Sequence, residues 1–263
     1  MRVDSFSLQH TLDSGQFFRY EKTGDWYHCK ERGKSFRIRQ KGSELEFEGA
    51  DAKYIKQLFG LNCKYGKIIQ ELSKDKKLLP AIKKYHGLRI MQRDPWETLI
   101  SFQCSIFSNI KKIKLNMKLF EKKIGKDFAG KLDNLQKIKK CATGFRAKYI
   151  HQANKMVDDK YFEKLKKKNY QEAKKELMKL PGVGEKVADC ICLFSLDKTE
   201  AFPVDVWMQR MMKKYYKKEK LKDKQQIAQQ KWKFPGYAQQ FLFHWGRHQQ
   251  PQVVECARKI GAP

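Results

Sequence analysis

The chain has 263 residues, of which 41% are hydrophobic and 13% aromatic, and its formal net charge at pH 7 is +28. This composition excludes a disordered chain and allows a substantial core in one or two domains. No apolar run approaches the roughly 18 residues of a membrane-spanning helix, and no signal-type apolar segment follows Met1. We therefore expect a soluble, intracellular protein. The positive charge favours polyanionic partners, which include nucleic acid, membrane surfaces and acidic proteins.

The first part of the chain is expected to form an antiparallel sheet. Four short segments are aromatic or alternate in polarity, and glycines separate them as turns. These segments are residues 17–20, 26–29, 35–39 and 45–48. Their period of two is typical of half-buried antiparallel strands.

From about Ala52 the pattern becomes helical, because apolar residues recur three and four positions apart. Further along, Asp94 is suited to a helix N-cap and Pro95 to the first helical position. We predict an α+β protein with an N-terminal antiparallel sheet domain over residues 1–86. A mostly helical domain is expected over residues 87–263.

A glycine-rich turn between two helical patterns occupies residues 180–186, Leu-Pro-Gly-Val-Gly-Glu-Lys. The first helical pattern runs to Leu180 and ends at Pro181. Gly182 and Gly184 then allow a tight turn that residues with a Cβ would strain. A second helix is expected to start directly after the turn. The free N–H groups of its first turn and the positive end of its dipole suit a phosphate.

Two residues near this turn have the chemistry of a catalytic pair. Lys186 lies in the first turn of the second helix, and a neutral lysine amine is a nucleophile that forms Schiff bases. Asp205 follows Pro203-Val204 and precedes another helical pattern, so it is a predicted N-cap that also faces Lys186. Taken alone, Lys186 is equally compatible with a simple phosphate contact, and Asp205 with a cap and nothing more.

The hairpin, Lys186 and the Pro203-Val204-Asp205 motif together resemble the helix-hairpin-helix, Gly/Pro-Asp superfamily of DNA glycosylases, and specifically the 8-oxoguanine DNA glycosylase/lyases. Other segments resemble this family in the same order along the chain: residues 11–20, 85–103, 104–112, 144–149 and 236–247. The resemblance implies that Lys186 attacks C1′ of the damaged nucleotide while Asp205 stabilises positive charge on the sugar. Monofunctional relatives usually carry another residue at the lysine position, so Lys186 also implies a lyase step.

The resemblance also implies which residues bind the extruded base. The backbone carbonyl of Gly15 would accept a hydrogen bond from N7–H of 8-oxoguanine, whereas normal guanine has a bare acceptor at N7. Gln239 would read the Watson–Crick edge and Phe243 would stack on the base. These two residues are four apart, so one helix face presents both. Cys190 shares a helix face with Lys186 and would pack against the other side of the base.

The segment 104–112 departs from the family pattern. The family usually has consecutive asparagines here, one of which fills the space left by the extruded base. In this chain that position reads as Phe107 or Ser108, and only Asn109 remains. Lys112 stands where eukaryotic members have an arginine that contacts the orphaned cytosine. This departure predicts a weaker preference for cytosine opposite the lesion.

Phe145 matches an aromatic wedge position of the family, where a ring pushed between bases replaces lost stacking. An ordinary core position at a helix start is the alternative for this residue. The further residues that we assign to DNA contact are Arg146, Gly182, Gly184 and Trp207, together with Phe107, Asn109 and Lys112.

The sequence thus predicts a monomeric enzyme that excises 8-oxoguanine from duplex DNA and nicks the strand. No cofactor is required for this chemistry, although hairpin carbonyls in this superfamily often hold a structural cation. The seven cysteines are scattered and expected to be reduced, and no cysteine cluster follows the catalytic region. The iron–sulfur cluster of many endonuclease III-type enzymes is therefore expected to be absent.

Two alternatives remain. The first is a glycosylase for another oxidised or alkylated base, against which Gly15, Gln239 and Phe243 argue. The second is a non-enzymatic helix-hairpin-helix protein that only binds DNA, against which the pair of Lys186 and Asp205 argues.

Overall fold

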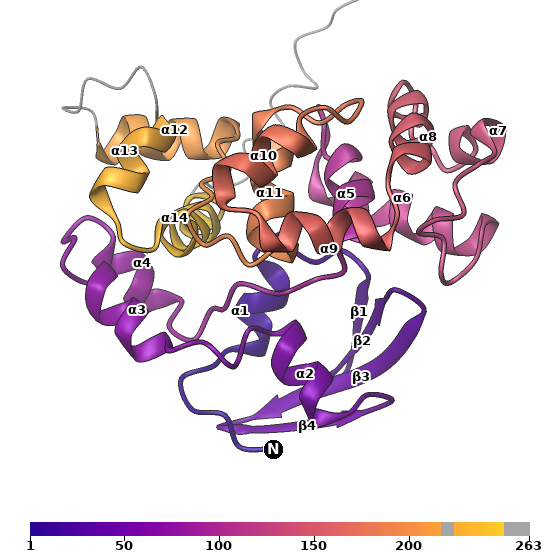
Figure 1. Ribbon diagram of the computed structural model, residues 1–263. Coiled ribbons are helices and arrows are strands. Elements are labelled where there is room, and N and C mark those ends of the chain that lie inside the picture. Colours follow the sequence, from indigo (N-terminus) through magenta and orange to yellow (C-terminus); the bar gives the residue numbers. More distant parts are fainter. Residues whose placement is uncertain (217–223, 250–263) are drawn as a thin grey trace, which may run out of the picture.

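The computed structural model describes residues 1–216 and 224–249. A four-stranded antiparallel sheet near the N-terminus lies beside a larger body of helices (Figure 1). The strands follow one another in the sheet in chain order, as β1 Tyr20–Thr23, β2 Trp26–Glu31, β3 Lys34–Lys41 and β4 Glu44–Glu48. In the register, Tyr27 pairs with Ile38, and Ile38 pairs with Phe47. The predicted α+β class and the antiparallel sheet are confirmed.

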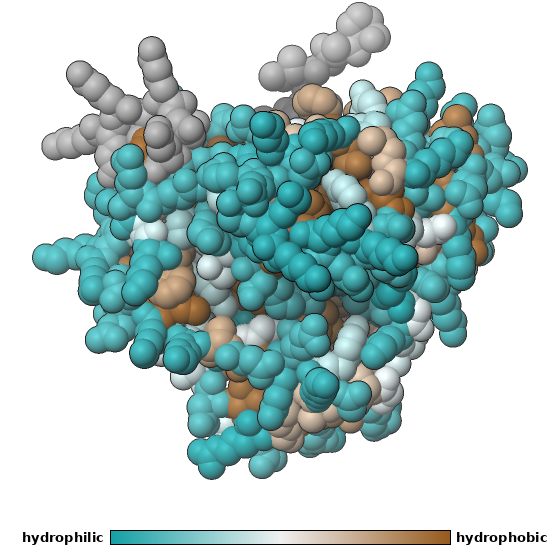
Figure 2. Space-filling view, viewed as in Figure 1, coloured by the Kyte–Doolittle hydropathy of each residue, from teal (hydrophilic) through white to brown (hydrophobic). Residues whose placement is uncertain are grey.

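Helices make up most of the remaining described chain. They are α1 Leu8–Asp13, α2 Ala52–Leu58, α3 Tyr65–Leu72, α4 Leu79–Lys84, α5 Pro95–Gln103, α6 Ile110–Lys123, α7 Leu135–Lys139, α8 Arg146–Met156, α9 Asp159–Lys167, α10 Tyr170–Leu177, α11 Glu185–Ser195, α12 Val206–Tyr215, α13 Lys224–Lys231 and α14 Pro235–Gln249. Within residues 1–216 and 224–249, no helix is both long and apolar enough to cross a bilayer. Hydrophilic side chains cover most of the face drawn in Figure 2.

Two buried clusters of apolar side chains stabilise the fold. The smaller one combines the inner face of the sheet with α1 and α2, and includes Leu12, Ile38 and Ile55. The larger one joins the helices from α3 onward. Side chains of α3 and α4 belong to the larger cluster although they precede residue 87. The predicted boundary between residues 86 and 87 stays a prediction.

The expected first strand at residues 17–20 is wrong for residues 17–19, because β1 begins at Tyr20. Phe17 and Phe18 are both buried, one in each cluster, and Arg19 is buried in an ion pair with Glu97. The aromatic pattern of this segment therefore reflects burial on both sides rather than pairing in a sheet.

A buried network of charges connects the sheet to the start of α5. Arg93 Nη2 lies 3.3 Å from Glu31 Oε2, and the Asp94 N–H donates to Glu31 Oε1 at 2.7 Å. Burial, the largest cause, raises the pKa of Glu97 to about 8. Asp94 caps α5 by accepting from the Glu97 N–H at 2.8 Å, and Pro95 follows it, as predicted. Because unpaired buried charges are costly, this network holds α5 in one orientation relative to the sheet.

Six of the seven cysteines lie in the described part of the chain, and each of these is a free thiol. This agrees with the prediction of reduced cysteines for those six positions. Cys256 lies outside the described residues.

Candidate active site

The helix-hairpin-helix forms where it was predicted, although its first helix is shorter. The helix α10 ends at Leu177, and a turn replaces the expected helical residues up to Leu180. The second helix, α11, begins at Glu185 as predicted. The Ala188 N–H is bonded to Gly184 O at 2.9 Å, so the N–H groups of the first turn of α11 point out of the helix end.

The two hairpin glycines differ in what their backbone requires. Gly182 has a φ of +74°, and a Cβ at this position would lie 2.7 Å from Tyr149 Cβ. Gly184 is the N-cap of α11 with a φ of −88°, and a Cβ there would meet nothing within 4 Å. The expectation that a Cβ strains the turn is therefore confirmed for Gly182 and wrong for Gly184.

Replacing each glycine by alanine should show this difference. We expect Gly182→Ala to lower the free energy of unfolding by about 2–4 kcal/mol, because it combines a left-handed backbone with a steric overlap. Gly184→Ala in the same turn should cost less than about 1 kcal/mol. Urea denaturation of both variants measures the difference, and equal losses would show that the backbone conformation at Gly182 is not the cause.

Lys186 projects from the first turn of α11 into a cavity of about 1480 Å³. Its Nζ donates to Ser105 Oγ at 2.8 Å and lies 5.1 Å from the centroid of the Phe102 ring. The neighbouring Gln103 donates from Nε2 to Pro181 O at 2.8 Å, which holds the end of α5 against the hairpin. The amine is thereby held at the edge of the cavity.

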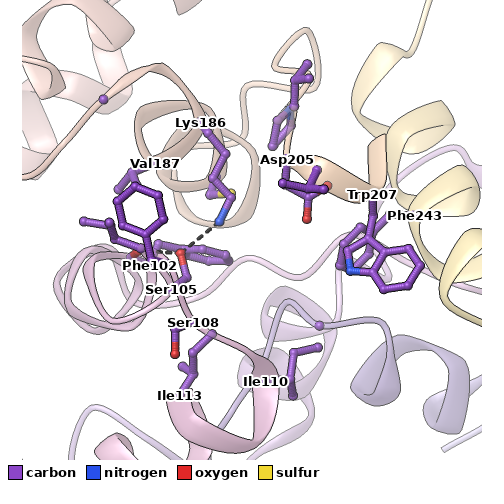
Figure 3. Close-up of a pocket in the computed structure, with 18 of the residues that line it drawn as sticks. Phe102, Ser105, Ser108, Ile110, Ile113, Lys186, Val187, Asp205, Trp207 and Phe243 are labelled. Carbon is purple, nitrogen blue, oxygen red and sulfur yellow. Dashed lines mark hydrogen bonds between the residues drawn. The ribbon is translucent and has the colours of Figure 1, made fainter. Parts of the chain in front are cut away.

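Asp205 lies on another wall of the same cavity. It is the N-cap of α12, and its Oδ1 accepts from the Met208 N–H at 2.8 Å, which confirms the predicted cap. Figure 3 shows Lys186 and Asp205 extending from different elements toward a shared space, with Phe243 and Ile110 on other walls. The arrangement places an amine and a carboxylate around one site, a combination that can support nucleophilic catalysis with electrostatic stabilisation.

Residues from distant parts of the chain form the far wall. Gly15 has a φ of +81°, and a Cβ there would lie 3.0 Å from Phe243 Cε1 and 3.1 Å from Ile110 Cδ1. Gln240 donates from Nε2 to Ser14 O at 2.9 Å, which fixes the Gly15 turn against α14. A side chain at position 15 would therefore crowd the Phe243 ring and Ile110, and the left-handed backbone also favours glycine here.

Gln239 and Cys190 also line the cavity. Gln239 is 4% exposed, and its Oε1 is buried with no hydrogen-bond partner in the described part of the chain. An unpaired buried acceptor in a cavity suits the N–H donors of a base edge. Cys190 is also buried at the cavity, and this burial raises its pKa to about 12 although the charge of Lys186 opposes the shift. Its thiol therefore stays neutral and acts as an apolar contact.

Comparisons with known proteins agree with this geometry. Residues 1–99 match the model of the 8-oxoguanine DNA glycosylase N-terminal domain, and residues 173–194 match the helix-hairpin-helix motif. The structure of a Clostridium acetobutylicum 8-oxoguanine glycosylase/lyase, solved with DNA containing cytosine opposite 8-oxoguanine, is similar. The TM-score is 0.85 and the identity 30%, over 93% of this chain and 92% of that one.

The chain belongs to the 8-oxoguanine DNA glycosylase family.

Curated relatives of this family match over shorter parts. The N-glycosylase/DNA lyase of Saccharomyces cerevisiae is 33% identical over 49% of this chain and 42% of its own length. The N-glycosylase/DNA lyase OGG1 of Arabidopsis thaliana is 32% identical over 76% of this chain and 64% of its own length. The chain thus spans less than two thirds of either curated relative.

The loop before α6, where the sequence departs from the family pattern, has a defined backbone conformation. Phe107 is 94% exposed and has a φ of +46°, a left-handed conformation that is rare for an aromatic residue. Phe145, at the start of α8, is 53% exposed, so the alternative of a core position is wrong. Asn109 caps α6 by accepting from the Lys112 N–H at 2.9 Å. The exposed ring of Phe107 therefore lines the cavity, and the exposed ring of Phe145 packs against Tyr149 of the cavity wall.

Arg146 makes hydrogen bonds within the protein. It is 8% exposed, and its guanidinium donates to Phe107 O at 2.9 Å and from Nε to Ile106 O at 2.6 Å. These bonds tie the Phe107 loop to the start of α8. The predicted contact of Arg146 with DNA stays a prediction.

Trp207 lies half-buried on the cavity wall, and the Arg210 guanidinium lies 5.3 Å from its ring centroid. Ser105 and Arg247 are among the polar residues of the cavity wall that the sequence analysis does not assign to the site. Both lie within segments that resemble the family, but neither is part of a sequence motif that would have identified it as a site residue. The predicted hairpin cation and the predicted absence of an iron–sulfur cluster stay predictions.

Proposed function

We propose that this protein removes 8-oxoguanine from duplex DNA and then nicks the strand at the resulting abasic site. One observation carries the proposal: Lys186 and Asp205 share a cavity whose far wall is formed by Gly15, Gln239 and Phe243. Lys186 and Asp205 supply the chemistry, and the far wall fits a planar base. The enzyme acts as a monomer in this proposal and needs no cofactor for either step.

The proposed reaction begins with extrusion of the base from the helix, which costs a few kcal/mol. Contacts between phosphates and the hairpin amides at Gly182 and Gly184 offset this cost, as does the general attraction of a chain with a net charge of +28. The protein would hold the duplex bent, with the damaged nucleotide in the cavity.

The chemical steps use the two residues in sequence. The Lys186 nitrogen attacks C1′ as the C1′–N9 bond breaks, and the electron pair of that bond leaves with the base. The proton that the attacking nitrogen loses neutralises the departing base. Asp205 stabilises positive charge on the sugar as this happens. Opening of the sugar ring gives a Schiff base between Lys186 and C1′, loss of a C2′ proton follows, and the 3′ phosphate leaves by β-elimination.

Lesion choice rests on Gly15 and Gln239. The Gly15 carbonyl attracts N7–H of 8-oxoguanine and repels the bare N7 of guanine, whereas the unpaired Gln239 Oε1 accepts from the Watson–Crick edge. A glycosylase for another base would need a different pattern of donors and acceptors on this wall.

The decisive experiment is borohydride trapping on duplexes that carry 8-oxoguanine opposite each of the four bases. We expect a covalent protein–DNA adduct on every lesion duplex and none on undamaged DNA. A panel of duplexes with alkylated and other oxidised bases should be cut at least tenfold more slowly. Tight binding without any adduct would favour a protein that only binds DNA, and faster release of another base would favour the other glycosylase.

The exposed ring of Phe107 predicts a weak dependence on the opposite base. A ring fills the gap by stacking, at about 1–3 kcal/mol per base, and stacking is tolerant of sequence. We expect release rates within about tenfold of one another for the four opposite bases. Phe107→Ala should slow all four by about 5- to 150-fold, whereas Phe107→Asn should restore a preference for cytosine. Single-turnover kinetics measure this, and a strong cytosine preference in the parent enzyme would contradict it.

A further inference from the structure

Arg247 lies on the wall of the active-site cavity, where neither the sequence motifs nor the proposed chemistry uses it. It follows Phe243 by four residues on α14, so the two side chains share a helix face. Its guanidinium carbon is 5.5 Å from the centroid of the Phe243 ring. Its Nη1 lies 3.4 Å from the point that a Cβ on Gly15 would occupy. Arg247 therefore borders the same space as the two residues proposed to hold the base.

One nitrogen of the Arg247 guanidinium lacks a hydrogen-bond acceptor in the part of the chain that the structure describes. Its Nη1 is buried and has no partner among residues 1–216 and 224–249. Burial lowers the pKa of Arg247, while the nearby groups of Tyr20, Asp205 and Asp13 oppose the shift. A buried cationic donor without an acceptor costs free energy, which a ligand with a carbonyl or an anionic group recovers.

The chemistry of the lesion supplies such an acceptor beside Gly15. On 8-oxoguanine, the N7–H that faces the Gly15 carbonyl is flanked by the carbonyl oxygens O6 and O8. When the C1′–N9 bond breaks, the electron pair stays with the base, so negative charge spreads onto these oxygens. A cation placed next to them is more strongly attracted in the transition state than in the bound substrate.

We propose that Arg247 donates a hydrogen bond to a carbonyl oxygen of the extruded base and stabilises the negative charge that this base carries away. This inference rests on the proposed function. It assigns Arg247 to departure of the base and leaves lesion choice to Gly15, because a guanidinium also suits the N7 and O6 acceptors of normal guanine. Asp205 and Arg247 then act on opposite sides of the breaking bond, one on the sugar cation and the other on the base anion.

The test measures base release, in which the damaged base takes part, separately from strand nicking, in which it does not. Single-turnover rates are measured on a duplex with 8-oxoguanine, where all abasic sites are cleaved chemically to report base release. The same enzymes are measured on a duplex with a preformed abasic site, where only nicking is possible. The variants are Arg247→Met, which keeps the length of the side chain, and Arg247→Lys, which keeps its charge. Arg2→Met, at an exposed position paired with Asp4, is the control for loss of one positive charge.

We expect Arg247→Met to slow base release by about 10²- to 10³-fold, the usual effect of removing one donor from a developing anion. Nicking of the preformed abasic site and affinity for that duplex should stay within about twofold of the parent enzyme. Arg247→Lys should recover part of the rate of base release, and Arg2→Met should match the parent in both assays.

Two outcomes would overturn the inference. Equal losses in base release and in nicking or binding of abasic DNA would make Arg247 a phosphate contact or a purely structural residue. Base release that is unchanged in Arg247→Met would show that the departing base does not need this cation. If the parent enzyme neither releases the base nor nicks abasic DNA, the proposed function fails instead, and that result is read before any variant is compared.

Discussion

Lys186→Gln is expected to abolish both base release and the trapped adduct, with a loss of at least about 10³-fold in the single-turnover rate. The amide has no nucleophilic lone pair on nitrogen, so no bond to C1′ can form. The fold should be unaffected, because Lys186 is half-buried and Ser105, which accepts its hydrogen bond, can also accept from an amide. Gel analysis of the borohydride-treated reaction and quantification of released base measure the two effects.

Lys179→Gln is the matched control, because Lys179 is an exposed lysine close to the hairpin and paired with Glu176. This variant should keep the adduct and the rate within about twofold. If Lys186→Gln still formed an adduct, the Schiff base would belong to another amine, and Lys111 on the cavity wall would be the next residue to test.

Asp205→Asn is expected to slow base release by about 10²- to 10³-fold while leaving stability almost unchanged. Asparagine caps helices about as well as aspartate, so the bond from the Met208 N–H persists. The negative charge near the sugar is lost, and with it the stabilisation of the transition state. Single-turnover base release and urea denaturation of the same preparations measure the two quantities.

Asp205→Ala provides the comparison, because it removes the charge and the cap together. It should lose a similar factor in rate and, in addition, about 1 kcal/mol in the free energy of unfolding. If Asp205→Asn kept the parent rate and only Asp205→Ala lost activity, Asp205 would serve as a helix cap and not as part of the chemistry.

Local features of the fold could be read from the sequence because they depend on neighbouring residues. Asp94 and Asp205 cap helices as predicted, since a cap needs only a side-chain acceptor next to a helical pattern. The start of α11 at Glu185 and the strands β2 to β4 follow from turn glycines and periodicity in the same way. The segment 17–19 was misread because burial on two sides and pairing in a sheet leave a similar aromatic pattern.

The resemblance to the family predicts which residues bind the base. That these residues lie close together is shown only by the tertiary structure. Gly15 precedes the sheet and Phe243 lies on α14, and the contact between them depends on Gln240 holding the Gly15 turn. Periodicity places Gln239 and Phe243 on one helix face, yet it does not say which distant segment that face meets.

The class of fold, the hairpin and the positions of Lys186 and Asp205 can be predicted from the amino-acid sequence, because they depend on periodicity and on motifs of a few consecutive residues. The tertiary structure is needed to show that Arg146 binds the Phe107 loop, and that Nη1 of Arg247 is buried without an acceptor among the described residues. Whether a polar group is exposed, hydrogen-bonded or buried without a partner depends on atoms from several distant segments of the chain. The sequence shows that a hydrogen-bond donor is present, but only the packing of the folded chain determines which acceptor lies within reach of it.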